Sequence, residues 1–142
     1  MSTVNVTNEA AQTKALAEQT RLASSKLRLF KSSLTPSINT TREQLLAAEA
    51  DFSGYSSGGL TVTAWTDPVR DPRGGWSIES GLKQFTVTDP DPDPIVPNDI
   101  GGYWVETVGG KVDFVVQFDA SVEMAQVGDG IPLIAVDLFS VQ

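Results

Sequence analysis

Apolar and polar side chains alternate with a period of two in most of the chain after Leu60, and this pattern constrains the fold more than any other. Two alternating segments, residues 102–108 and 111–118, are separated by Gly109-Gly110. A pair of glycines between two such segments is typical of a tight β-hairpin with a primed turn, because glycine adopts positive φ at little cost. No helical period lies between the alternating segments. The sequence therefore predicts an antiparallel β-sandwich or barrel and excludes a parallel α/β fold.

Three further segments have the pattern of strands. Residues 60–65 and 83–88 alternate, and a last strand is predicted over residues 131–139, after a glycine-rich turn at 128–130. Pro132 has no backbone N–H, so this last strand is predicted to lie at the edge of a sheet or to begin its pairing there.

The first 31 residues differ in composition from the rest and predict a helix. Residues from Asn8 to about Lys31 contain no glycine or proline and are rich in good helix formers, and Asn8 is a suitable N-cap. Their apolar stripe is weak, so such a helix needs a partner surface. Residues 26–31 also alternate, and a first strand is an equally good prediction for them. We divide the chain into an N-terminal basic helical arm, residues 1–31, and a β-sandwich body, residues 32–142.

A short helix is predicted near the start of the body. Thr40 with Glu43, or Thr41 with Gln44, can form a capping box, in which each side chain satisfies the backbone N–H of the other residue. The helix is predicted to run from Arg42 to about Ala50.

The net charge of −8 is unevenly distributed. Residues 1–42 hold six basic and two acidic groups, a net +4, whereas residues 43–142 hold four basic and sixteen acidic groups, a net −12. An acidic body repels phosphate backbones, so we expect no nucleic-acid binding. The asymmetry suggests a basic arm that lies on an acidic surface, either its own or a neighbour's, but a helix whose charges only keep it solvated is an equally good interpretation.

The chain has neither cysteine nor histidine, and this excludes several classes of function. Disulfides, thiol nucleophiles, Cys/His zinc sites and serine–histidine triads all need one of these residues. No apolar run approaches the roughly 18 residues of a membrane span, and the N-terminus lacks the pattern of a secretory signal. We expect a protein that is made in the cytoplasm, needs no cofactor and has no membrane partner.

Carboxylate pairs remain as the one candidate for catalysis. Glycoside hydrolysis needs two carboxyl groups roughly 5–10 Å apart in a cleft, one of them with a raised pKa. The candidates are Glu79, Glu106, Asp113 and Glu123. Their sequence spacing singles out no pair, and we predict that the protein is not an enzyme.

The segment Asp89-Pro90-Asp91-Pro92-Asp93-Pro94 is the most unusual in the chain. Three carboxylates on a stiff extended backbone are compatible with a hard cation such as Ca²⁺. An EF-hand loop, however, needs a central glycine and a terminal glutamate, which this segment lacks. We expect a rigid acidic surface loop rather than an ion site at Asp89, Asp91 and Asp93.

The aromatic residues suggest a core and one interface anchor. Trp65 and Trp104 lie in alternating segments, where aromatic rings usually fill the core of a sandwich. Trp76 lies in a predicted loop beside Arg73, and such a tryptophan is typical of a protein interface. The alternative is a sugar-stacking platform built from the three tryptophans with Tyr55 and Tyr103.

The order of several segments resembles small structural proteins of tailed-phage virions. The resemblance is carried by Leu29-Phe30-Lys31 with Thr35-Pro36, by Asp51-Phe52-Ser53-Gly54-Tyr55, by Ile100-Gly101-Gly102-Tyr103-Trp104-Val105, and by Gly128-Asp129-Gly130-Ile131. It covers about residues 26–65 and 100–139. The basic, alanine-rich segment before Lys26 and the Asp-Pro repeat depart from the pattern and leave the position on a virion open.

The resemblance implies a jelly-roll-like sandwich that forms homo-oligomers, often trimers, as phage head decoration (cement) proteins do. It implies a location in the virion, assembled in the host cytoplasm, with the major capsid protein and further copies of the chain as partners. A glycan- or receptor-binding module of the tail is the alternative. The residues predicted to contact these partners are Arg21, Leu22, Lys26, Leu27, Arg28, Leu29, Phe30, Arg73 and Trp76.

Overall fold

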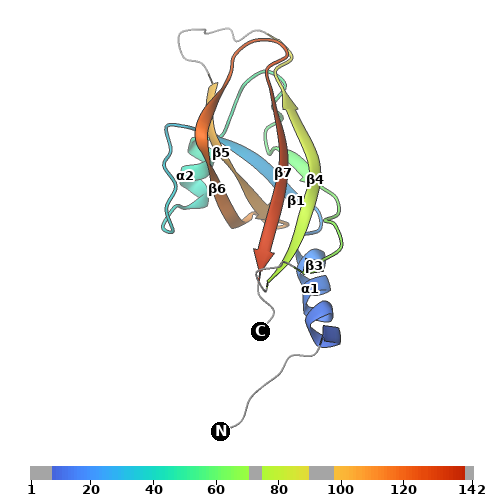
Figure 1. The fold of residues 1–142 in the computed structure, drawn as a ribbon. Helices are drawn as coiled ribbons and strands as arrows, with labels where there is room; N and C mark the ends of the chain where they lie inside the picture. Colours follow the sequence, from blue (N-terminus) through green and yellow to red (C-terminus); the bar gives the residue numbers. More distant parts are fainter. Residues whose placement is uncertain (1–7, 71–74, 90–97, 140–142) are drawn as a thin grey trace.

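Two antiparallel β-sheets form most of the molecule (Figure 1). The structure, a computed structural model, describes residues 8–70, 75–89 and 98–139. Its elements are α1 (Asn8–Leu22), β1 (Ser25–Lys31), α2 (Arg42–Ala47), β2 (Leu60–Val62), β3 (Val69–Arg70), β4 (Trp76–Thr86), β5 (Asn98–Thr107), β6 (Lys111–Met124) and β7 (Gly130–Phe139). One sheet has the strand order β2-β1-β5-β6 and the other β3-β4-β7. The predicted all-β sandwich is confirmed, and the jelly-roll topology stays a prediction.

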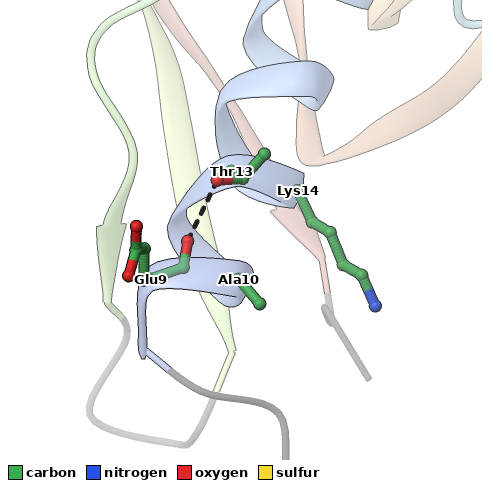
Figure 2. A pocket seen from close by; sticks show the side chains of 4 residues that line it. All are labelled: Glu9, Ala10, Thr13 and Lys14. Carbon is green, nitrogen blue, oxygen red and sulfur yellow. Dashed lines mark hydrogen bonds between the residues drawn. The ribbon is translucent and has the colours of Figure 1, made fainter.

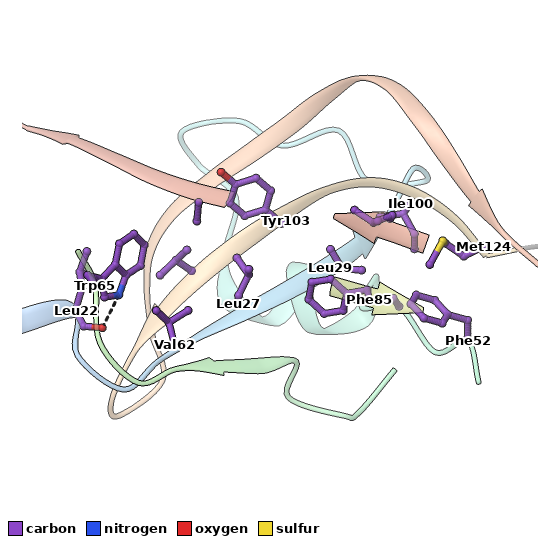
Figure 3. Close-up of a cluster of buried hydrophobic side chains, with 14 of the residues drawn as sticks. Leu22, Leu27, Leu29, Phe52, Val62, Trp65, Phe85, Ile100, Tyr103 and Met124 are labelled. Atoms are coloured by element: carbon purple, nitrogen blue, oxygen red, sulfur yellow. Dashed lines mark hydrogen bonds between the residues drawn. The ribbon is translucent and has the colours of Figure 1, made fainter. Parts of the chain in front are cut away.

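The main core lies between the two sheets (Figure 3). Leu27 and Leu29 of β1 point into it because side chains two residues apart share a face of a strand. Phe30 points to the other face, where it packs with Trp104 and with Leu45 of α2 in a second, smaller cluster. The four-stranded sheet is therefore covered on both faces, and β5 is buried along nearly its whole length.

The predicted hairpin and short helix are both confirmed. β5 and β6 pair up to Thr107 and Lys111, so the hairpin forms as predicted. The primed turn predicted for it is wrong: the Gly110 N–H donates to the Thr107 carbonyl oxygen, and the positive φ values lie at the third and fourth residues of this turn, Gly109 (+100°) and Gly110 (+81°), rather than at the second. α2 is capped by Thr41, whose side chain accepts a hydrogen bond from the backbone N–H of Gln44, while the side-chain oxygen of Gln44 accepts one from the Thr41 N–H. Of the two capping pairs proposed from the sequence, the second is the one that forms. The helix ends at Ala47, three residues before the predicted end.

The boundary predicted at residue 31 is wrong. Residues 25–31 form a strand, the alternative that the alternation of 26–31 had left open, and this strand lies between β2 and β5 in the middle of the four-stranded sheet. α1 is shorter than predicted and ends at Leu22, which is fully buried in the main core. The indole N–H of Trp65 donates to the Leu22 carbonyl oxygen at 2.8 Å (Figure 3). Residues 8–31 are thus part of the folded body rather than a separate arm.

Several strands differ in length from their predictions because irregular pairing interrupts the alternation. β4 begins at Trp76 rather than residue 83, and its register with β7 shifts between Glu79 and Leu82. β6 continues past residue 118 to Met124, and its register with β5 shifts between Ile100 and Gly102. β2 is shorter than predicted and ends at Val62.

The last strand lies where Pro132 predicted it. β7 pairs with β4 alone and forms one edge of the three-stranded sheet within the described residues. Among these same residues, neither α1 nor α2 is long and apolar enough to cross a membrane.

Candidate interaction surface

The apolar residues predicted to bind a partner are occupied within the chain. Leu22, Leu27, Leu29 and Phe30 are all fully buried. Three of them lie in the main core and Phe30 in the smaller cluster. They did need burial, as the sequence indicated, but they find it in their own sandwich, so the prediction that they contact a capsid or a neighbouring subunit is wrong.

Four basic residues of the predicted arm, Arg21, Lys26, Arg28 and Lys31, contact the chain's own body. Arg21 forms ion pairs with Glu18 and, at 2.6 Å, with Asp113 of β6. The ammonium group of Lys26 donates to the hydroxyl of Thr61 at 2.6 Å. The two alternatives for the basic segment, its own surface or a neighbour's, are therefore resolved for Arg21 in favour of its own.

Trp65 and Trp104 were predicted to lie in the core, and both do. Trp65, Trp104 and Tyr103 are buried, although Trp65 lies in the loop after β2 rather than in a strand. The loop position predicted for Trp76 is wrong: Trp76 is the first residue of β4, where it is half-buried and paired with Phe139. Arg73 and positions 91 and 93 of the Asp-Pro repeat lie outside the described residues.

Of the four carboxylates considered for catalysis, Glu106 is enclosed in an ion-pair network. It is 2% exposed. Its carboxylate accepts hydrogen bonds from Nε of Arg42 at 3.0 Å and from the indole N–H of Trp104 at 2.9 Å. Nη2 of Arg28 lies 3.4 Å from the same carboxylate. The Arg28 guanidinium also lies over the Trp104 ring, with its Cζ atom 5.8 Å from the ring centroid. This arrangement binds β1, β5 and the start of α2 together, and it is typical of a structural ion pair rather than of a proton donor in a cleft.

Asp113 belongs to a second group of charges, which sequence spacing did not reveal. Oxygen atoms of Glu18, Asp113 and Asp137 lie within 4.8 Å of one another, and Arg21 bonds to the first two. Burial raises the pKa of Asp137 to about 7, and a hydrogen bond with Glu18 adds to the shift. The Arg21 guanidinium lowers the pKa of Glu18. The cluster joins α1 to one strand of each sheet, with a proton on Asp137 reducing the repulsion between the carboxylates.

We expect this cluster to make stability depend on pH. The native pKa of Asp137, about 7, lies above its ordinary value of 3.8, so the native state holds this proton more tightly than the unfolded state. The contribution of Asp137 to stability is present below pH 4 and is lost as the pH rises through 7. Asp137→Asn should therefore gain Tm relative to the wild type as the pH rises from 4.5 to 7, and the difference should level off above pH 8. Thermal unfolding by circular dichroism measures both profiles.

Asp119→Asn is the matched control, because Asp119 is an exposed carboxylate on β6. Its Tm profile should run parallel to that of the wild type. A profile of Asp137→Asn that also runs parallel would contradict the assignment of the proton to Asp137.

A shallow hollow on α1 offers no binding site of its own. It is lined by Glu9, Ala10, Thr13 and Lys14, all from the first turns of the helix (Figure 2). The Thr13 hydroxyl donates to the Glu9 carbonyl oxygen at 3.0 Å, a bond within the helix. No second element contributes a polar group to the hollow among these lining residues, whereas a specific pocket needs convergent ones.

The surface that distinguishes the molecule is the outer face of β4 and β7. Its apolar members, which we call the β7 face, are Leu82 (66% exposed), Ile134 (47%), Val136 (38%) and Leu138 (56%). Leu82 lies opposite Ile134 in the sheet, so the four form one patch. Grouped exposed apolar side chains mark interaction sites more often than scattered ones do. The sequence carried a signal for this face, because the last strand is apolar at both its inward and its outward positions, Asp137 excepted.

Comparison of the chain with models of protein families, with curated protein sequences and with solved structures gave no match, so the functional argument rests on the β7 face and the residues around it.

Proposed function

We propose that this protein is a structural component of a tailed-phage virion, a head decoration protein that binds the major capsid protein and stabilises the shell. The observation that carries the proposal is the β7 face, an apolar patch on the outside of a small β-sandwich, with Glu79 as the charged neighbour of Val136. The resemblance of residues 26–65 and 100–139 to small virion proteins supports the class of protein. The pairing of Glu106 and Asp113 with arginines also favours a binding role over catalysis.

The β7 face replaces the helical segment as the proposed contact with the capsid. Apolar area removed from water stabilises an interface by about 25 cal/mol per Å². A patch of four side chains gives a single weak contact, and a repeating shell multiplies such contacts into stable attachment. Assembly onto the virion in the host cytoplasm is part of the proposal, whereas the homotrimer implied by the resemblance is not required for it.

Binding to capsid shells tests the proposal with two variants that are matched in chemistry. Shells that lack the protein are mixed with the purified chain and sedimented, and the bound fraction is measured. Leu82→Lys should weaken binding about tenfold or more, because it places a charge in the β7 face. Val108→Lys is the control, since Val108 is equally exposed but lies in the β5–β6 turn.

Mass spectrometry and imaging of purified particles give the copy number and location. Hundreds of copies on the head are expected. Absence from particles, or equal binding by the Leu82→Lys variant, would contradict the proposal. The glycan-binding alternative has less support, because Trp65, Trp104 and Tyr103 are buried and cannot stack on a sugar. A handful of copies at the tail would favour it instead.

A further inference from the structure

We propose that two copies of this chain pair edge to edge along β7, antiparallel and about a twofold axis at Val136, to join two three-stranded sheets into one of six strands. This inference goes beyond the proposed function and does not depend on it. It rests on the direction of the backbone groups of β7, on the side chains along its edge, and on the position of Pro132.

Backbone hydrogen bonds fix which residues of β7 face its free edge. The N–H of Ala135 donates to the Ser80 hydroxyl of β4 at 2.9 Å, so Ala135 faces β4. On β4, the Glu79 carbonyl oxygen accepts from Thr66 at 2.8 Å, on the side away from β7, which leaves the neighbouring Ile78 to pair with β7. The N–H and C=O of a residue in an antiparallel strand point to the same side, and the side alternates along the strand. Residues 134, 136 and 138 therefore point their backbone groups away from β4.

This edge lacks the protection that other edges of the two sheets have. β2 and β3 are only three and two residues long. β6 carries four charged side chains along its length, at positions 111, 113, 119 and 123. The outward side chains of β7 from Ile134 to Leu138 are all apolar. Charges and short strands prevent edge-to-edge pairing in natural proteins, as edge prolines and inward-pointing charges do. The outward positions of β7 from Ile134 to Leu138 carry no charge, and the protective residues of this strand are Pro132, which precedes that segment, and Asp137, which points inward.

The side-chain pattern is symmetric about Val136. Antiparallel pairing centred there places Val136 opposite its own copy and Ile134 opposite Leu138 of the second copy, so each outward pair is apolar. No other strand of the described residues pairs with this edge, so these residues can offer their backbone groups to the partner, and each pair can form two hydrogen bonds. Pro132 selects this register, because an axis at Ile134 would set the proline opposite Val136 and remove a donor from the ladder.

The acidic charge of the chain does not oppose this pairing at close range. Glu79 is the exposed charge next to Val136 in the sheet. In the paired sheet it would lie three strand spacings from its copy, about 14 Å, which exceeds the Debye length of about 8 Å at physiological ionic strength. The strand edge buries less than the roughly 800 Å² per partner of a stable complex, so the dimer should depend on protein concentration.

Disulfide trapping tests the register directly, because the full chain contains no cysteine. Residues of a hydrogen-bonded antiparallel pair have Cα atoms about 5.5 Å apart, within the range that a disulfide spans. Val136→Cys should form a covalent dimer under mild oxidation. Leu82→Cys is the matched control, since Leu82 belongs to the same face but lies one strand away from the edge. Equal trapping of both variants would overturn the proposal.

Sedimentation velocity over a range of concentrations gives an independent measurement without oxidation. The wild type should pass from monomer to dimer, and Val136→Lys should raise the dissociation constant about tenfold or more, by placing like charges opposite each other. Leu82→Lys should dimerise as the wild type does. A wild-type chain that stays monomeric, or a dimer unaffected by Val136→Lys, would overturn the proposal. Leu82→Lys tests the two proposals separately: if it fails to bind shells but still dimerises, the capsid contact and the β7 pairing are independent of each other.

Discussion

Glu106→Ala is expected to lower the free energy of unfolding by about 3–5 kcal/mol, the range for breaking a buried ion pair by removing one partner. Glu106 is the common partner of Arg28, Arg42 and the Trp104 indole N–H. Without its carboxylate, the mostly buried guanidinium of Arg28 keeps only its ion pair with Glu49, at 3.4 Å. The Trp104 N–H, in the smaller core cluster, loses the acceptor that it has in the structure.

Urea denaturation followed by tryptophan fluorescence measures this change. Glu106→Gln should cost less than the alanine variant, because the amide oxygen still accepts one hydrogen bond. Glu123→Ala is the control on β6, where the side chain is exposed, and its effect should stay within about 0.5 kcal/mol. An alanine variant of Glu106 as stable as the wild type would show that the network contributes nothing net to folding.

Leu22→Ala is the second substitution with a large expected effect, about 2–5 kcal/mol of lost stability. Leu22 is fully buried at the end of α1 and contacts the main core, and its carbonyl oxygen accepts the hydrogen bond from Trp65. The substitution leaves a cavity where the helix meets the sandwich. Deletion of residues 2–22 should destabilise the body further, because it also removes the Leu22 carbonyl oxygen and leaves the buried Trp65 N–H only its longer hydrogen bond to the Ser25 hydroxyl, at 3.1 Å.

Leu16→Ala on the same helix provides the control, because Leu16 is largely exposed. Its effect on the urea midpoint should be small. If Leu22→Ala and the deletion both left the unfolding of the sheets unchanged, α1 would be a detachable arm after all, as the basic composition of this segment had predicted.

Local sequence signals were sufficient for much of the fold. The glycines at 109 and 110, the Thr41–Gln44 capping box and Pro132 each act within a few residues, and each predicted its element correctly. The alternation of residues 26–31 also indicated a strand, which forms as β1. Choosing strand over helix there required the partners β2 and β5, which lie far along the chain.

The charge clusters could not be predicted for the same reason. Glu106 meets Arg42 across 64 positions, and Arg21 meets Asp113 across 92. No spacing rule connects such residues, because the sheet order alone decides which side chains become neighbours. The β7 face was within reach of the sequence, since an edge strand with apolar residues on both faces must expose one of them.

The position of β1 also determines the order in which the protein can fold during synthesis. β1 is synthesised before both of its partners, because Leu27 pairs on one side with Leu60 and on the other with Val105. Its central place in the sheet therefore stays incomplete until β5 has been made. Non-local pairing of this kind slows folding, because the intervening chain must close a large loop before the contacts stabilise it. Between the synthesis of β2 and that of β5 the nascent chain carries a strand with one partner missing, the state in which chaperones are most useful to a β protein.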